Sequence, residues 1–307
     1  MASVLVALAM TGTAELPLKS RSAGANHFST TSQPALSPQE QAKEILMGDV
    51  LSDDDTLSYS GYVVEKRHKK VRYDYPAEIR SQPSWIDVSY AVLKRQGNVL
   101  VTFDDGIYFG MGGNDTRFGL FSFLPSPTKE LVVSQDVFRG GTQWVVNLSP
   151  QPRIIFDGPK WGVGREGDDL TIIDLDHDGV FEIVVPITDF YEFQDKLPMA
   201  RIPLPGIIFK YDGAAMKYVP ANPLFESYAL HWISDLDVDT GPDEFDRRAI
   251  VLEKLLAFIY VGKQKQAWDF YDRSYKLSDK EEIRHRVKAI LIKQPVYKFI
   301  YNPRSRK

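Results

Sequence analysis

The sequence predicts a mainly β protein that ends in a C-terminal α-helical segment. Two observations support this prediction. From about residue 58 to residue 223, short runs rich in Val, Ile, Phe and Tyr alternate with turn signals such as Asp157-Gly158. After residue 242, apolar positions recur with the helical period of about 3.6 residues. Because almost no helical pattern interrupts the β-like runs, we expect the strands to pair antiparallel, as hairpins.

Composition sets the class of protein and excludes several kinds of site. The chain has 307 residues, of which 43% are hydrophobic and 25% charged, as in ordinary globular proteins of about two domains. A net charge of −4 gives no basic signature, so we expect no nucleic-acid partner. The absence of cysteine excludes a disulfide scaffold, a thiolate metal site and a cysteine nucleophile.

Residues 1–37 are expected to be a signal-like segment followed by a linker. An apolar run, Val4–Met10, precedes small residues that end at Ala14, as in a secretory signal, although no basic residue comes before Lys19. Residues 20–37 are rich in Ser, Thr, Ala and Pro. We therefore expect export to the periplasm or the extracellular space, with a cytoplasmic location as the alternative. No segment has the length and apolarity of a transmembrane helix.

Residues 38–230 are expected to form a short helix followed by an antiparallel β domain. Ser37-Pro38-Gln39-Glu40 is a capping box with proline at the first helical position, which predicts a helix to about Met47, before Gly48. Asp53, Asp54 and Asp55 come next and are expected in a solvated loop. The expected strands are Tyr62–Lys66, Val88–Arg95, Val99–Phe103, Arg117–Leu124, Glu130–Gln135, Gln143–Leu148, Arg153–Phe156, Leu170–Asp174, Glu182–Thr188, Gly206–Tyr211 and Met216–Val219.

The spacing of these strands indicates a repeated architecture. Roughly four strands occur in every 50 residues or so, which is the period of a β-propeller blade. About three such units are present, whereas a closed propeller needs about four or more. We therefore expect antiparallel four-stranded units in a partial or irregular β-propeller-like arrangement, with a β-sandwich as the alternative.

One loop carries a pattern typical of cation binding. Asp174, Asp176 and Asp178 alternate within five residues, and Gly179 permits a sharp turn. Carboxylates so close together repel one another unless a hard cation binds, and Ca²⁺ takes about six to eight oxygen ligands. The alternative is an acidic hairpin turn without a metal. The expected ligands of a bound Ca²⁺ are Asp174, Asp176, Asp178, the Val180 carbonyl and Glu182.

The loop resembles a known calcium-binding repeat. An EF-hand is excluded because its last ligand would fall at Val185 and its flanks would be helical. The pattern strand, Asp-x-Asp-x-Asp-Gly-x-x-Glu, strand resembles the FG-GAP/VCBS-type repeats of integrin α-like propellers, over about residues 168–220. The resemblance implies the same ligand set, and it implies that His177 points outward. Only one clean loop of this kind occurs, and the Phe-Gly/Gly-Ala-Pro signature is not evident.

Residues 231–307 are expected to be helical. One helix should span Pro242–Val261, a second should follow Gly262, and a third should begin at the capping box Ser278–Glu281 and end at Pro295. The first two resemble a single tetratricopeptide hairpin, which implies that these helices dock on the β domain or on a partner. The residues at that repeat's spacing are Phe258, Gly262, Ala267, Tyr271 and Ser274.

Three other patterns have plainer explanations. The acidic stretch Asp235–Asp243 leads into a helix, where acids favour the N-terminus, so a cap is favoured over a metal site. Gly162–Gly167 matches a dinucleotide fingerprint by letter, but two acids and a strand follow it, so we expect a loop. Packing is favoured over sugar or peptide stacking for four tryptophans, namely Trp85, Trp144, Trp161 and Trp232.

The motifs favour binding over catalysis. No Gly-x-Ser-x-Gly, His-Glu-x-x-His or phosphate-loop motif occurs in the sequence, and no catalytic residue is proposed. We expect a non-enzymatic, calcium-stabilised β-repeat protein that binds a protein or glycan partner. One alternative is a hydrolase for a polysaccharide or phosphate ester, with the acidic loop near its active centre. Another is an adaptor whose C-terminal helices bind the partner.

Overall fold

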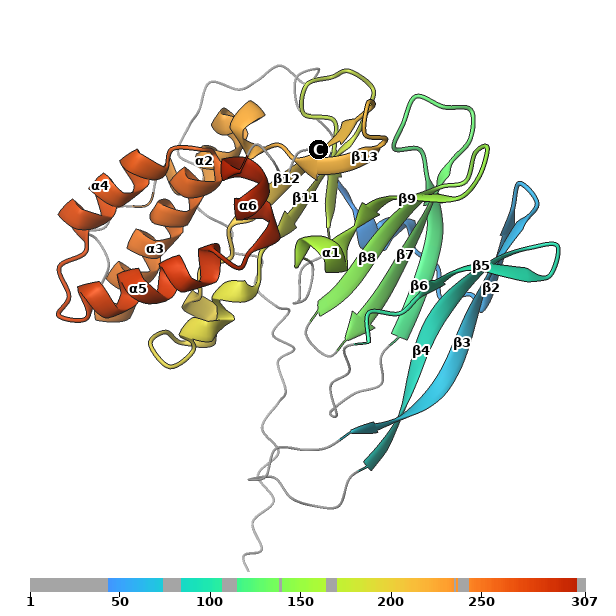
Figure 1. Cartoon of the computed structure of the whole chain (residues 1–307), viewed down its shortest axis with the longest axis horizontal. Helices are drawn as coiled ribbons and strands as arrows, with labels where there is room; N and C mark the ends of the chain where they lie inside the picture. Colours follow the sequence, from blue (N-terminus) through green and yellow to red (C-terminus); the bar gives the residue numbers. More distant parts are fainter. Residues whose placement is uncertain are drawn as a thin grey trace, which may run out of the picture. The chain divides into compact units, whose positions relative to one another are not determined.

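The described strands form three antiparallel sheets, and most of the helices follow them in the chain, which confirms the predicted fold class. The computed structural model describes residues 44–73, 84–106, 115–137, 140–163, 170–234, 236 and 243–302 (Figure 1). All of these residues belong to one unit, Ala42–Lys307. Within them, the sheets do not close into a barrel or a complete propeller. The predicted signal-like segment and linker lie outside the described residues.

The first sheet contains the longest hairpin of the described chain. β3 and β4 each have 12 residues, and they pair along their whole length. The sequence predicts only Tyr62–Lys66 of β3 and Val88–Arg95 of β4, and charged residues such as Lys69 and Lys70 occupy most of the rest of β3. Gly61 and Gly97 have positive φ values and close the two short turns of the sheet. The strands are, in order, β2 (Thr56–Tyr59), β3 (Tyr62–Tyr73), β4 (Ser84–Arg95) and β5 (Asn98–Phe103).

The second sheet is also a meander and leads into a short helix, α1 (Gly158–Trp161). The Asp157 carboxylate accepts the Lys160 N–H at 3.3 Å and begins this helix, and Gly162, with φ +68°, ends it. Gly162 therefore closes a helix and does not open a nucleotide-binding one, while residues 164–169 lie outside the described part. The strands are β6 (Asp115–Phe121), β7 (Glu130–Val137), β8 (Gly140–Asn147) and β9 (Arg153–Asp157).

The third sheet adds a distant strand to a four-stranded meander. Its order is β1-β10-β11-β12-β13, and all neighbours are antiparallel. Short 3-10 turns lie between β11 and β12 and after β13: η3 (Asp189–Phe193), η4 (Met199–Arg201) and η5 (Asn222–Leu224). The strands are β1 (Ile45–Leu46), β10 (Thr171–Ile173), β11 (Glu182–Pro186), β12 (Gly206–Asp212) and β13 (Lys217–Pro220).

The predicted helix ending near Met47 is wrong in the part that the structure describes. Ile45 and Leu46 form β1, and Met47–Val50 form a 3-10 turn, η1. Ile45 pairs with Ile172, and the Met47 N–H donates to the Leu170 carbonyl at 2.7 Å. These bonds to the edge of the third sheet satisfy backbone groups that a local helix would otherwise have paired.

Five helices make up most of the C-terminal part. Asp243 caps the start of α3, because its carboxylate accepts the Asp246 N–H at 2.8 Å, which confirms the expected cap. Two of the helices, α2 and α6, were not predicted. None of the described helices has the length and apolarity needed to cross a membrane. The helices are α2 (Glu226–Ser234), α3 (Glu244–Tyr260), α4 (Gln264–Ser274), α5 (Lys280–Leu291) and α6 (Pro295–Tyr301).

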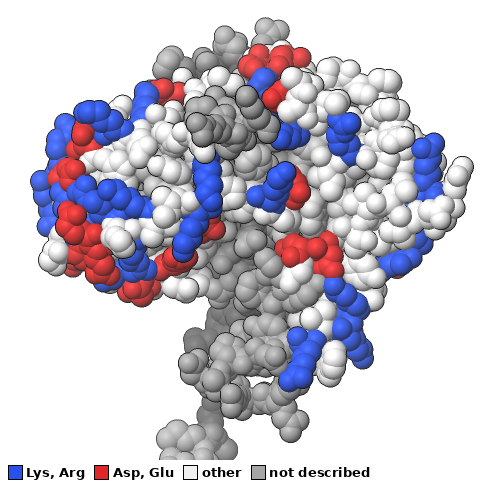
Figure 2. Space-filling model, in the orientation of Figure 1, with Lys and Arg blue, Asp and Glu red and all other residues white. Residues whose placement is uncertain are grey.

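The helices share a core with the β part. A single cluster of buried side chains includes Leu252 and Leu256 from α3, Ile207 from β12 and Val145 from β8. On the surface, Arg286 of α5 donates to the Asp195 carboxylate at 2.8 and 2.9 Å, next to η3. Figure 2 shows that positive and negative side chains are mixed over α4 and α5.

A second apolar cluster joins the first and second sheets. Leu131, Val133 and Trp144 of the second sheet pack there with side chains such as Leu93 of β4. The alternate residues of the same strands, such as Val132, belong to the other cluster. The second sheet is therefore buried on both faces, which explains why β7 and β8 contain continuous apolar runs instead of alternating ones.

Candidate metal centre

The predicted cation loop lies in the hairpin between β10 and β11, where Ile173 pairs with Glu182. Both oxygens of the Asp174 carboxylate accept backbone N–H groups, from Asp178 at 3.2 Å and from Gly179 at 3.1 Å. Gly179 has φ +81°, and the exposed His177 has φ +58°. Asp174 and the left-handed residues thus fold the chain back on itself and bring the acidic side chains together.

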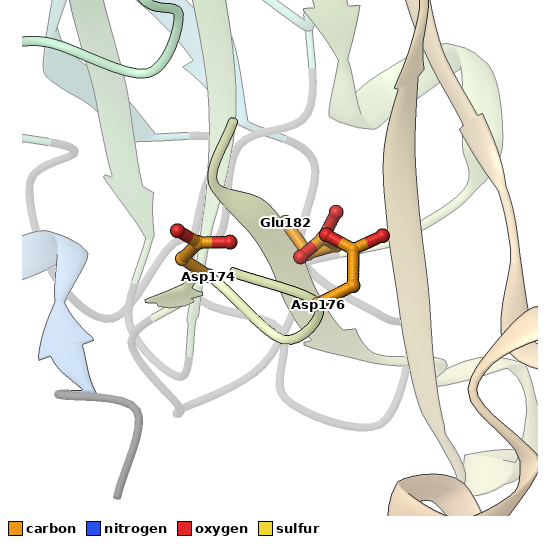
Figure 3. A group of neighbouring side chains, drawn as sticks. All are labelled: Asp174, Asp176 and Glu182. Atoms are coloured by element: carbon orange, nitrogen blue, oxygen red, sulfur yellow. The ribbon is translucent and has the colours of Figure 1, made fainter. Parts of the chain in front are cut away.

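Three of the predicted ligands come close together. Asp174, Asp176 and Glu182 each offer an oxygen within 4.8 Å of the others, so the group could hold a metal ion. Figure 3 shows Asp174 and Asp176 reaching out of the loop and Glu182 coming from the start of β11. Asp176 is exposed, Asp174 is half-buried and Glu182 is buried. The site therefore has a fixed inner end and an open outer end.

Glu182 forms the fixed end. Its Oε2 accepts the N–H of Leu175 at 2.8 Å, and its Oε1 lies 3.1 Å from the Lys210 Nζ. Burial raises the pKa of the Glu182 carboxyl, against the opposing effects of these two partners. Because the side chain is fully buried, its negative charge is costly unless hydrogen bonds or a nearby cation compensate it.

Lys210 of β12 provides such a cation and was not predicted from the sequence. Its Nζ lies 2.8 Å from Asp176 Oδ2 and 2.8 Å from Asp178 Oδ2. Partial burial disfavours the ammonium, but its hydrogen bonds to Asp176, Asp178 and Glu182 outweigh that effect and raise the pKa of Lys210. The hydrogen bond that Lys210 donates to Asp178 lowers the pKa of the Asp178 carboxyl. An internal ammonium thus lies among the carboxylates.

Asp178 and Val180 lie differently from the three grouped ligands. Asp178 uses Oδ1 to accept the Val180 N–H at 2.8 Å and uses Oδ2 to bind Lys210. Its carboxylate is therefore engaged with the loop backbone and the lysine, outside the group of three. Val180 contributes a donor to the turn, and its expected role as a carbonyl ligand stays a prediction.

The charge balance shows what this arrangement can do. The cluster contains four carboxylates, of which Lys210 contacts those of Asp176, Asp178 and Glu182. With the Asp174 carboxylate and the ammonium included, a fully ionised cluster carries 1 − 4 = −3. Lys210 relieves only part of the repulsion. A divalent cation would relieve more of it, in competition with the ammonium for Asp176 and Glu182.

The tryptophans mostly confirm the packing interpretation. Trp144 is buried against Phe103, with ring centroids 5.6 Å apart, and Trp161 lies 5.6 Å from the ring of Phe209. Trp85 is the exception, with 67% of its surface exposed. The side chain of Trp232 lies outside the described part.

The carboxylates of this site are close together in sequence, whereas their ionic partner, Lys210, is distant in sequence. Asp174, Asp176 and Glu182 could be found from their spacing, but Lys210 reaches the loop from another strand. The functional argument rests on this geometry, because comparison with protein-family models, with curated proteins and with solved structures found no match to the chain.

Proposed function

We propose that the chain is a non-enzymatic β-repeat protein whose Asp174–Glu182 loop binds Ca²⁺ as a structural ion. The observation that carries the proposal is the convergence of the Asp174, Asp176 and Glu182 oxygens to within 4.8 Å. The tight turn at Gly179 and the strands on both sides of the loop support the same interpretation. They also support a relationship to FG-GAP/VCBS-type repeats, which is part of the proposal.

The donor set favours calcium over other common metals. All the grouped side chains offer carboxylate oxygens, whereas zinc sites in proteins mainly use nitrogen and sulfur donors. Mg²⁺ demands nearly octahedral geometry at about 2.0–2.1 Å and keeps most of its waters. Ca²⁺ accepts irregular sets of oxygens at about 2.3–2.6 Å, which suits a loop with one buried and one exposed acid.

The ion's proposed role is to fix the β10–β11 hairpin. Its carboxylates come from both ends of the loop, so a shared cation would tie the end of β10 to the start of β11. Lys210 already links the carboxylates of Asp176 and Glu182. Its side chain is 23% exposed, so it could turn toward solvent when Ca²⁺ binds. Calcium would then stabilise the sheet by binding the folded state alone.

The partner belongs to the same proposal. We infer that an exported protein of this kind binds a protein or a glycan through the loops of its sheets, with the ion keeping one of these loops in shape. The alternative, a hydrolase, receives no support from the loop itself, because its carboxylates are held by backbone N–H groups and by Lys210.

Thermal unfolding in calcium and in chelator tests the proposal. At about 100 times the dissociation constant, binding adds about 2.7 kcal/mol, which corresponds to a rise of roughly 5 to 10 °C in melting temperature. Asp176→Asn should lose most of this rise. Asp55→Asn is the matched control, because Asp55 is an exposed acid in another loop.

The ion identity is tested in the same experiment. Mg²⁺ at equal concentration should give a much smaller rise than Ca²⁺, because it is reluctant to lose its waters. Equal melting temperatures in calcium and in chelator would refute the calcium site and leave an acidic turn neutralised by Lys210. A rise that persists in Asp176→Asn would place the calcium elsewhere.

A further inference from the structure

A cavity separates the third sheet from the helices α2 and α3. It has a volume of about 220 Å³ and is largely enclosed. Its walls are mostly apolar, and the lining residues used below are Val184, Ile208, Ala229, Ala257, Tyr228 and Glu253. Val184 and Ile208 pair across β11 and β12, and neither belongs to the main apolar cluster. The packing between this face of the sheet and the two helices is therefore incomplete.

Glu253 of α3 is the unusual group in the wall. Burial raises the pKa of its carboxyl, and no hydrogen bond or neighbouring charge contributes to that shift. The carboxyl has no hydrogen-bond or ion-pair partner among the described residues. Glu253 is half-buried, so its carboxyl loses part of its hydration, and no charged partner compensates that loss.

The other polar groups of the wall have partners. The Asn222 amide accepts the Ile208 N–H at 2.8 Å and donates to the Gly206 carbonyl at 2.9 Å. The Tyr228 hydroxyl donates to Glu44 Oε1 at 3.2 Å. Among the polar side chains of the described lining, Glu253 is therefore the one that has no partner and is available to a bound molecule.

We propose that this cavity binds a small organic cation, with an ammonium group on Glu253 and an apolar body against the sheet and helices. A carboxylate accepts hydrogen bonds and donates none, so its complement is a donor, and a cationic donor compensates its charge best. The apolar walls select a hydrocarbon body. An apolar cavity of about 150 Å³ is enough for benzene, so 220 Å³ accommodates one ring with a short ammonium arm.

Benzylamine is a suitable probe, and benzyl alcohol is its uncharged counterpart of nearly equal shape. Binding of both to the full chain can be measured by calorimetry and by ligand-observed NMR at neutral pH, in calcium and in chelator. We expect saturable binding of benzylamine and binding of benzyl alcohol that is weaker by roughly tenfold or more, since a charge-assisted hydrogen bond is lost.

Two variants locate the binding. Glu253→Gln keeps the shape of the side chain and should remove the preference for benzylamine over benzyl alcohol. Glu244→Gln is the control on the same helix, because Glu244 is 57% exposed, and it should leave the preference unchanged. Ala257→Leu should weaken both probes by filling the cavity.

The benzylamine and benzyl alcohol measurements test this proposal whether or not the loop binds calcium. Equal affinity for the two probes would overturn the proposal, as would the absence of saturable benzylamine binding in the millimolar range. A loss of preference in both glutamate variants would assign the effect to surface charge and would overturn it too. Melting curves show that each variant is folded, and the preference should be the same in calcium and in chelator.

Discussion

At the residue scale, Lys210 determines how the acidic loop behaves without a metal. The ammonium touches three carboxylates that repel one another, and one of them, Glu182, is buried. A salt bridge between exposed groups contributes little, but a buried carboxylate that loses its partner is costly. The Lys210 ammonium therefore neutralises part of the loop's charge without a metal ion. Replacing Lys210 would separate its contribution from that of a bound metal ion.

Lys210→Met should destabilise the protein in chelator by about 1 to 3 kcal/mol, because Glu182 loses an ionic partner while the apolar stem is kept. Lys210 also lowers the pKa of the Asp178 carboxyl, so the ionised Asp178 stabilises the folded state at neutral pH. This stabilisation is lost as the pH falls through the lowered pKa. The deficit of the variant should therefore shrink in acid. Chemical unfolding at neutral and acid pH measures both effects.

The effect of calcium on the melting temperature of Lys210→Met is a second measurement. If the ammonium and the ion compete, Ca²⁺ should raise the melting temperature of Lys210→Met more than that of the unmodified protein. Lys217→Met, on the neighbouring strand β13, is the control and should respond to calcium as the unmodified protein does. A calcium response that is the same in all three proteins would contradict competition at this site.

Glu253→Gln should stabilise the protein at neutral pH by about 1 kcal/mol, because it removes a half-buried charge that has no partner. The raised pKa means that ionisation of Glu253 costs stability as the pH rises through and above its ordinary range. The advantage of the variant should therefore grow from acid to neutral pH. Tyr228, the other titratable group of the lining, has a raised pKa and stays neutral over that range.

Denaturant unfolding at a series of pH values measures the Glu253→Gln effect. Glu244→Gln should give no comparable gain, because Glu244 is exposed and paired with Arg248. If Glu253→Gln were destabilising at neutral pH, the carboxyl would have to make a favourable interaction that its surroundings do not indicate.

The residues of the candidate site could be predicted only where they are neighbours in sequence. The spacing of Asp174, Asp176 and Glu182 led to a loop that does gather their oxygens. Lys210 escaped notice because it reaches the loop through the register of β11 with β12, in which Ile183 pairs with Phe209. The place of Glu253 in the cavity wall could not be predicted either, since a single acid in an amphipathic helix is normally on the solvated face.

At the element scale, β11 and β12 connect the two candidate sites. Alternate residues of a strand share a face, so Glu182 and Val184 point the same way, as do Ile208 and Lys210. The acidic loop is at one end of this face, and the cavity begins at the next cross-strand pair. The two candidate sites are therefore adjacent and are formed by different side chains.

Gly119 of β6 lies against the backbone of η1 and Leu51. A Cβ at this position would lie 1.7 Å from the Val50 carbonyl oxygen, which is a backbone atom that cannot simply rotate away. Gly119→Ala should therefore shift η1 or β6 and cost about 2 kcal/mol or more. Gly213→Ala is the control, because a Cβ added there would meet no atom within 4 Å.

Melting curves of the two glycine variants test this contact. Gly119→Ala should unfold at a clearly lower temperature, or should fail to accumulate as folded protein, whereas Gly213→Ala should behave nearly as the unmodified chain. Equal stability of the two variants would mean that η1 does not cross β6 as closely as described.

Strands and helices with long apolar patterns can be predicted from the sequence, whereas those that depend on tertiary contacts cannot. Every strand expected from residue 62 onward is present, and α3, α4 and α5 begin near their expected positions. β1 was mistaken for the end of a helix because two residues carry no period, and only its pairing with β10 makes it a strand. The charged half of β3 was missed because it pairs with β4 without burying an apolar face.

At the scale of the whole described unit, one apolar cluster makes the third sheet, one face of the second sheet and the C-terminal helices mutually dependent. Leu252 of α3 is fully buried in the same cluster as Phe209 of β12 and Phe156 of β9. Helices that share a core in this way cannot open without exposing the sheet. We therefore expect the helices and the sheets to unfold together.

Leu252→Ala tests this dependence. Truncating a fully buried leucine should cost about 2 to 5 kcal/mol, whereas Ile292→Ala, at a residue that is 63% exposed, should cost little. The informative measurement is hydrogen exchange of α3 and of β7 and β8 at rising denaturant. If the unit is cooperative, Leu252→Ala accelerates exchange in the strands as much as in the helix, although Leu252 lies in the helix. Faster exchange confined to the helices would mean that they open independently of the sheets, and an adaptor role for them would then gain support.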